Sequence, residues 1–174
     1  MRDFADWLST TDLSLYIQEN NAWFIPGIQS LHIIAIGVLM ASILLVNLRI
    51  LGWVSRDQSL LQTTERYAPW MWGALVVLAV SGVLMIVGEP VRELLALSFW
   101  VKMSLLAIGI IVAIAFQISL RRHASAWETS LVSRGRIRSA AVITFLVWCG
   151  VAIMGRMIAF DGPFWGSLSP SNLI

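Results

Sequence analysis

Charged side chains are scarce in this sequence of 174 residues, since Asp, Glu, Lys and Arg together make up only 13% of it. Soluble domains are about a quarter charged, so the shortage argues against a soluble globular protein. Hydrophobic residues make up 58% of the chain, and the mean hydropathy is +0.79. Several apolar runs are long enough to cross a bilayer, which indicates an integral membrane protein.

Cysteine pairs and the signatures of soluble enzymes are also missing. The one cysteine, Cys149, lies inside an apolar run, so an intrachain disulfide is excluded. The chain has no glycine-rich phosphate loop, no HExxH or CxxCH motif and no nucleophile elbow. Soluble-enzyme chemistry and nucleic-acid binding therefore find no support, and we expect no catalytic activity of the protein on its own.

Four long apolar runs predict four transmembrane helices within one domain, residues 22–161. The predicted spans are residues 22–51, 69–88, 98–120 and 137–160. Their connections are short, so neighbouring helices should be antiparallel. The predicted fold class is all-α, an integral membrane four-helix bundle with up-down-up-down topology. Residues 162–174 form an outer C-terminal tail, in which Phe164 and Trp165 are expected to anchor at the interface and the remainder to be irregular.

Residues 1–21 are too polar to span a membrane and predict an N-terminal amphipathic helical segment at the interface. Its apolar face recurs at helical spacing through Phe4, Trp7, Leu8, Thr11 and Leu15. Hydroxyl side chains at 9–11 offer N-caps before Asp12, so two short helices are an alternative to one. The acidic residues here, and the lack of an apolar stretch, predict no cleavable signal peptide. We expect this segment to pack against the bundle.

The distribution of Lys and Arg predicts the orientation in the membrane. Eight of the twelve lie on one side: Arg49, Arg56, Arg66, Arg121, Arg122, Arg134, Arg136 and Arg138. The positive-inside rule therefore places loops 52–68 and 121–136 in the cytoplasm and both termini outside. In a bacterial inner membrane, outside means the periplasm.

Each predicted span carries one ionisable side chain toward the same outer side of the bilayer. These four residues are His32, Glu89, Lys102 and Arg156. Ionisable residues inside membranes are functional candidates by default, and together these would frame a pocket of net positive character. Met85 shares a helix face with Glu89, and Gln29 lies one turn from His32. The candidate cofactor-binding residues are His32, Lys102, Arg156, Glu89, Met85 and Gln29.

Three uses fit such a pocket. His32 could ligate the iron of haem b, with Lys102 and Arg156 paired to the propionates. The same groups could hold a quinone, with His32 donating to a carbonyl oxygen, or bind a small anion from outside. His123 is predicted on the other side of the membrane, so a second axial ligand would come from a methionine or from a second protomer. The methionines at suitable depth are Met85, Met154 and Met157.

Structural roles fit the same residues. The span-one histidine could hydrogen-bond to a backbone carbonyl or to Gln29, and the lysine could extend its ammonium group to the headgroups. Arg156 could pair with Glu89 or Asp161.

Asn47 lies near the opposite end of the first span, on roughly the same face as His32. A hydrogen bond from Asn47 to Gln117 or Trp72 is the expected structural role of its amide.

Four segments carry a resemblance to a known family. They are QSLHIIAIGVLMASILLVNLRILG, PWMWGALVVLAVSGVLMIVGEP, SFWVKMSLL and GRMIAF. They resemble an uncharacterised family of bacterial four-span membrane proteins over about residues 23–160. This family looks distantly similar to the copper-resistance D-like and b-type haem membrane proteins, a similarity that implies haem or redox work at His32.

The leading hypothesis is a redox subunit that binds haem b or a quinone around His32. The alternative is a non-catalytic membrane anchor that recruits a periplasmic partner through the N-terminal segment. A small transporter ranks third, because four spans usually need to oligomerise to form a pore. A membrane or periplasmic redox partner and a homo-oligomer are both compatible with these hypotheses.

Overall fold

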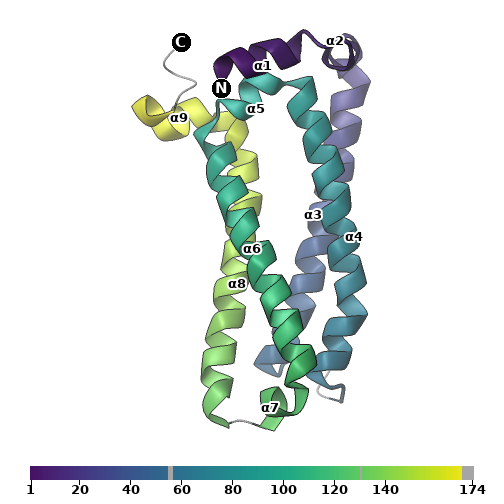
Figure 1. The fold of residues 1–174 in the computed structure, drawn as a ribbon, viewed down its shortest axis with the longest axis vertical. Helices are drawn as coiled ribbons and strands as arrows, with labels where there is room; N and C mark the ends of the chain where they lie inside the picture. Colours follow the sequence, from purple (N-terminus) through teal and green to yellow (C-terminus); the bar gives the residue numbers. More distant parts are fainter. Residues whose placement is uncertain (55–56, 130, 170–174) are drawn as a thin grey trace.

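The computed structural model describes residues 1–54, 57–129 and 131–169. Within these residues every regular element is helical, which confirms the all-α class. Four helices there are long and apolar enough to cross a membrane. They are α3 (Asn21–Leu51), α4 (Leu60–Gly88), α6 (Leu97–Arg122) and α8 (Leu131–Met157), and successive ones are antiparallel (Figure 1). Even α6, with 26 residues, is about 39 Å long, more than the ~30 Å of a hydrocarbon core.

Short helices cover the two ends of this bundle (Figure 1). One end, called the α1 end, carries α1 (Arg2–Ser9), α2 (Asp12–Glu19), α5 (Pro90–Leu94) and α9 (Asp161–Trp165). The opposite end, called the α7 end, carries α7 (Ala124–Thr129). Two 3-10 turns, Ile158–Phe160 and Gly166–Leu168, flank α9.

The start of α4 differs from the sequence prediction, because the helix begins at Leu60 and not at residue 69. Ser59 caps it: its Oγ accepts from the Gln62 backbone N–H at 3.1 Å, and the Gln62 side chain accepts from the Ser59 N–H at 3.0 Å. Pro69 therefore lies inside the helix. The first turns of α4 carry charged residues, so they lie outside the apolar run from which its start was predicted. The helix α8 likewise begins before its apolar run.

The long helices pack as two antiparallel hairpins, α3 with α4 and α6 with α8. The hairpins meet mainly where α3 contacts α8, whereas α4 and α6 barely touch. Trp148 of α8, only 1% exposed, is the centre of the core between them. Gly109 of α6 makes room for its ring, because a Cβ there would lie 3.1 Å from the indole. The other buried members of this core are Leu39, Ile43, Met71 and Ala74.

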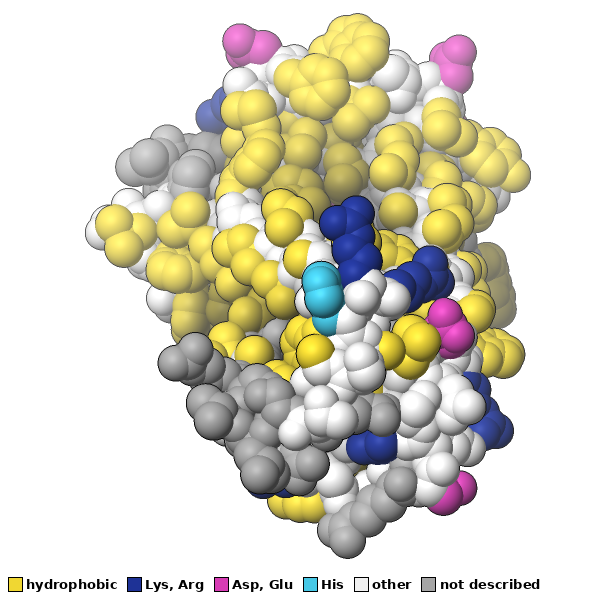
Figure 2. All heavy atoms as spheres, turned by 60° about the horizontal axis from the view of Figure 1, so that its bottom comes forward, with side chains coloured by type: hydrophobic (Ala, Val, Ile, Leu, Met, Phe, Trp, Pro, Cys, Tyr) yellow, Lys and Arg dark blue, Asp and Glu magenta, His cyan; other side chains and the backbone are white. Residues whose placement is uncertain are grey.

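Large apolar side chains cover the outside of the long helices, as expected for a surface that faces lipid. More than half of the surface is exposed in each of Ile33, Ile34, Val76, Ile111 and Ile143. Figure 2, with the α7 end turned forward, shows several Lys and Arg side chains at this end and hydrophobic side chains along the flanks. The bundle is therefore suited to a lipid bilayer.

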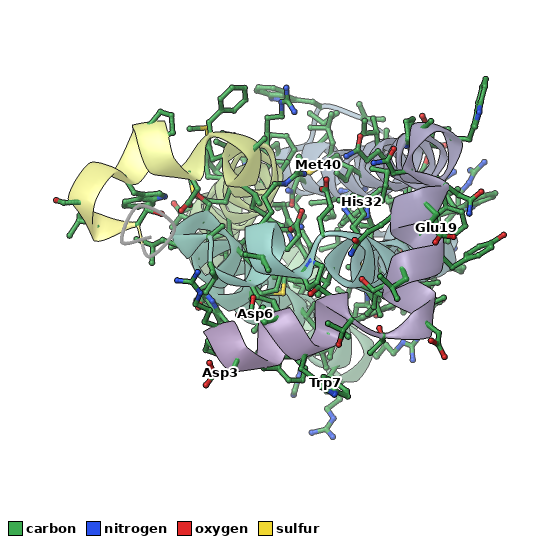
Figure 3. The ribbon with its side chains drawn as sticks, turned by 90° about the horizontal axis from the view of Figure 1, so that it is seen from above. Asp3, Asp6, Trp7, Glu19, His32 and Met40 are labelled. Atoms are coloured by element: carbon green, nitrogen blue, oxygen red, sulfur yellow. The ribbon has the colours of Figure 1, made fainter. Side chains whose placement is uncertain are left out.

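The N-terminal segment packs across the α1 end as two helices (Figure 3). Ala5 of α1 and Ile17 of α2 are fully buried, and the Ser14 hydroxyl donates to the Val87 carbonyl of α4 at 2.7 Å. The residues that dock the segment are therefore not those of the predicted apolar face. Trp7 points away from the bundle (Figure 3), and the exposed members of that face include Phe4, Trp7 and Leu15.

The C-terminal region folds back onto the first turn of α6. The buried carboxylate of Asp161 accepts hydrogen bonds from the backbone N–H groups of Leu97 at 3.0 Å and Ser98 at 2.8 Å, and from the Ser169 hydroxyl. Trp165 donates through Nε1 to Ser98 Oγ at 2.8 Å, so its side chain helps to hold the C-terminal region against α6. Asp161 thus caps helix N–H groups that have no partner inside the helix. The tail up to residue 169 is more regular than predicted, and residues 170–174 lie outside the described part.

Candidate functional site

His32 lies between the two helices of the first hairpin, in the half of the bundle nearest the α1 end. Its Nδ1 atom is 2.7 Å from Ser81 Oγ of α4. The Ser81 hydroxyl also lies 2.6 Å from the Val77 carbonyl in its own helix. In Figure 3, viewed from the α1 end, His32 lies within the outline of the bundle. The ring is half-buried, and Gly82 leaves space beside its Cε1 atom.

The contacts of Ser81 relate its hydroxyl proton to the tautomer of the imidazole. A hydroxyl has one proton to donate, and the Val77 carbonyl is within reach of it. When Ser81 donates to that carbonyl, its Oγ accepts from Nδ1 of His32, and the ring proton is on Nδ1. In the neutral ring Nε2 then carries a lone pair, which suits a metal ligand or the acceptor of a proton.

The histidine's partner was not among those expected from the sequence. Neither a backbone carbonyl nor Gln29 binds the His32 side chain, and in the described part of the chain Gln29 makes no side-chain hydrogen bond. Ser81 was missed because a serine is common in transmembrane helices. A usable signal exists, however: Ser81 is a lone hydroxyl in the apolar run of the second span, and an antiparallel hairpin brings it level with His32.

Lys102 reaches across from α6 toward α8. A Cβ placed on Gly155 would lie 3.5 Å from Lys102 Cε and 3.6 Å from its Nζ, so the lysine side chain runs closely over this glycine. The side chain is half-buried, and its charge lies within electrostatic range of His32. Lys102 and His32, two of the predicted site residues, thus lie on different hairpins and interact electrostatically.

Glu93 of α5 is a buried carboxylate that the sequence analysis missed. It is 4% exposed, and its Oε1 lies 3.8 Å from a guanidinium nitrogen of Arg92. Burial raises the pKa of the Glu93 carboxyl above its usual 4.5, while the positive charges of Arg92 and Lys102 oppose the rise. Lys102 therefore interacts electrostatically with Glu93 as well as with His32.

The remaining predicted site residues lie at the edge of this group. Glu89 ends α4 and pairs with Arg92 at 2.8 Å. Arg156 is exposed, and its guanidinium carbon lies 5.3 Å from the ring centre of Phe160. Within the described residues it makes no ion pair, so it binds neither Glu89 nor Asp161. Met85 is half-buried near the end of α4.

Asn47 takes no part in the hydrogen bond predicted for it. Trp72 Nε1 instead donates to Gln117 Oε1 at 3.2 Å, while the buried Nδ2 of Asn47 has no hydrogen-bond partner. This amide lines a cavity in the half of the bundle nearest the α7 end.

The described residues include no group of three or more His, Cys, Asp or Glu side chains placed to hold a metal ion. A site of that kind needs several protein ligands for one ion. Haem is a different case, because the porphyrin supplies four of the iron ligands and the protein needs to supply only axial ones.

Residues 4–161 match the family described as "Family of unknown function (DUF6644)", and since the match covers most of the chain, the protein belongs to that family. No curated protein and no solved structure matches the chain significantly. The family match agrees with the resemblance to an uncharacterised membrane family. The more distant similarity to copper-resistance and b-type haem proteins stays a prediction.

Proposed function

We propose that this member of the family is a membrane subunit that binds haem b through His32, in the half of the bundle nearest the α1 end. The observation that supports this most directly is the hydrogen bond from His32 Nδ1 to Ser81. It orients the ring and leaves the Nε2 lone pair for iron. A histidine that ligates a metal through one ring nitrogen usually donates a hydrogen bond from the other ring nitrogen to a neighbouring group.

The cationic residues at this end of the bundle suit the propionate groups of haem. Haem propionates are carboxylates that need cationic partners near the membrane surface. Lys102 lies within electrostatic range of His32, and Arg156 carries a guanidinium without an ion pair in the described part of the chain. These two residues would neutralise the propionates, and Met85 would offer its thioether as a second ligand. Haem bound in this way supplies one-electron transfer.

The same proton assignment makes a quinone a weaker candidate at His32. A quinone carbonyl needs a donor, and in this arrangement Nε2 of the neutral ring only accepts. A quinol hydroxyl could donate to it, so this site would favour the reduced form.

Absorption spectroscopy of the detergent-purified protein after haem supplementation tests the proposal. We expect a Soret band with about one haem per chain that is lost in His32→Ala and kept in His123→Ala. His123 is the matched control, because it is exposed at the end of α6 nearest α7. Ser81→Ala should bind haem but with lower affinity, since the ring loses its orienting partner. A protein that shows no Soret band, or one that His32→Ala leaves unchanged, would overturn the proposal.

A further inference from the structure

A second candidate site lies in the other half of the molecule, between the two hairpins near the α7 end. The structure has a cavity of about 360 Å³ there, within the range of about 300–1,000 Å³ typical of small-molecule sites. A dry cavity of about 150 Å³ already holds a benzene ring, so this one has room for two fused rings or for a ring with a chain. It is called the Asn47 cavity, and its lining includes Ile43, Asn47, Thr64, Met71, Ala141 and Trp148.

Two polar side chains in the wall of the Asn47 cavity have no partner. Asn47 is 8% exposed and Thr64 is 5% exposed, and neither Asn47 Nδ2 nor Thr64 Oγ1 makes a hydrogen bond. Leaving a buried donor without a hydrogen-bond acceptor is unfavourable. Two further polar groups in the same wall do have partners: Ser42 donates to the Val38 carbonyl, and Gln117 accepts from Trp72.

The polar and apolar parts of the cavity lie at different depths. Asn47 is four residues from the end of α3 and Thr64 four residues from the start of α4, so both lie about 6 Å inside those helix ends. Met71 and Trp148 line it closer to the middle of the bundle. A molecule that fits would place its polar group near the α7 end and its apolar body toward the centre.

We infer that the Asn47 cavity binds an apolar molecule that carries carbonyl oxygens. An amide N–H requires an acceptor, and the threonine hydroxyl can donate to a second one. Among the described residues no charged side chain lines the cavity, so a neutral buried part of the ligand fits it best. Membranes offer this chemistry in two forms, the ring of a quinone and the ester group of a phospholipid. The site is separate from His32 and does not depend on haem binding there.

Tryptophan quenching in nanodiscs tests the inference, with 2-methyl-1,4-naphthoquinone as the test ligand. The naphthoquinone should quench saturably. The saturable part should fall in Trp148→Phe, since Trp148 and Trp127 both line the cavity, and should be kept in Trp23→Phe, since Trp23 is 88% exposed and lies at the other end of α3. Each of Asn47→Leu and Thr64→Val should weaken its binding by roughly two- to tenfold, the worth of one hydrogen bond. Displacement by 2-methylnaphthalene, which has no carbonyl groups, should be unaffected by either change.

Ala141→Phe is the cavity-filling variant, because Ala141 is buried in the same wall. A second arm uses phospholipid with brominated acyl chains as the quencher. Saturable quenching by the naphthoquinone that Ala141→Phe removes identifies a quinone-type ligand. Quenching of Trp148 by the brominated lipid that Ala141→Phe removes, and that the naphthoquinone does not relieve, identifies a phospholipid.

Either of these results supports the inference. Quenching by both compounds that is unchanged in Asn47→Leu, Thr64→Val and Ala141→Phe would overturn it. Gel filtration shows which variants fold, and if Ala141→Phe aggregates, Asn47→Leu decides the outcome because it keeps the branching and the number of heavy atoms of the side chain.

Discussion

Glu93 is a residue through which pH can act on the α1 end of the bundle. Its carboxyl is buried, and the positive charges of Arg92 and Lys102 only partly offset the cost of ionising it there. The pKa in the folded protein therefore lies above its usual 4.5. The folded state holds this proton more tightly than the unfolded state does. The contribution of this protonation to the free energy of unfolding is complete below the usual pKa. It is lost as the pH rises through the pKa that Glu93 has in the folded state.

Glu93→Gln removes this dependence while keeping the shape of the side chain. We expect wild-type protein to lose stability relative to Glu93→Gln as the pH is raised from about 4 to about 8. Thermal unfolding in detergent across this range measures the difference. Glu19→Gln, at an exposed position of α2, is the control and should follow the wild type. A difference between wild type and Glu93→Gln that grows with pH in favour of the wild type would contradict the assignment.

The residues around His32 differ in how far they could be predicted. His32 was recognisable because an ionisable group is conspicuous in an apolar run. Ser81 and Glu93 were not, since a serine is ordinary in a span and Glu93 stands among other charged residues between two spans. Their roles depend on which side chains face them, and that is a property of the packing.

At the scale of elements, the helix α9 supplies the side chain that caps the N-terminus of α6. Asp161 supplies a charged acceptor to two N–H groups in the first turn of that helix, where a negative charge is also favoured by the helix dipole. Hydrogen bonds to charged groups contribute about 1.5–3 kcal/mol, so this cap is a large term for a single side chain.

Asp161→Ala should therefore lower the free energy of unfolding by about 2 kcal/mol. Asp161→Asn, which keeps one acceptor oxygen but not the charge, should lower it by less. Chemical unfolding of the purified protein followed by circular dichroism measures both variants against Asp3→Ala, an exposed acidic residue of α1. If Asp161→Ala were as stable as Asp3→Ala, the cap would not contribute to stability.

The docking of α2 onto α4 depends on a glycine. A Cβ at Gly88 would lie 2.8 Å from Ile25 Cδ1 and 2.9 Å from Ile17 Cγ2, so these side chains would have to move. A Cβ at Gly73, in the same helix, meets no atom within 4 Å.

Gly88→Ala should loosen α2, and Gly73→Ala should raise stability by up to about 1 kcal/mol, because alanine favours the helix over glycine. Hydrogen exchange over residues 2–19 measures the first effect, and exchange there should be faster only in Gly88→Ala. Equal protection of this segment in both variants would show that the close contact does not hold it.

At the scale of the whole molecule, the charge distribution and the fold both distinguish the same two ends of the bundle. The helices α1 and α9 lie at one end, and the arginine-rich connections lie at the other (Figure 1). The orientation of these ends in the cell remains the prediction of the positive-inside rule, with the α1 end outside.

Single cysteines in a Cys149→Ser background test this orientation. Thr10→Cys and Ser125→Cys place exposed thiols at the α1 and α7 ends, respectively. A membrane-impermeant maleimide should label Thr10→Cys in intact cells and Ser125→Cys only after lysis. The reverse pattern would place the α1 end in the cytoplasm.

The sequence by itself determined the number of spans, the all-α class and the antiparallel order of the helices. These follow from local quantities, namely the length of each apolar run and the shortness of the connections. His32 and Lys102 could also be singled out, because charge inside an apolar run is visible in the sequence alone.

Only the tertiary structure decided which side chains meet. The rotation of α3 against α4 sets His32 on Ser81, the docking of α5 buries Glu93, and the packing of the two hairpins leaves a cavity beside Asn47. Helix faces in a membrane are apolar on all sides, so hydropathy does not distinguish the inner face from the one toward lipid. Contacts between helices distant in the sequence settle that choice.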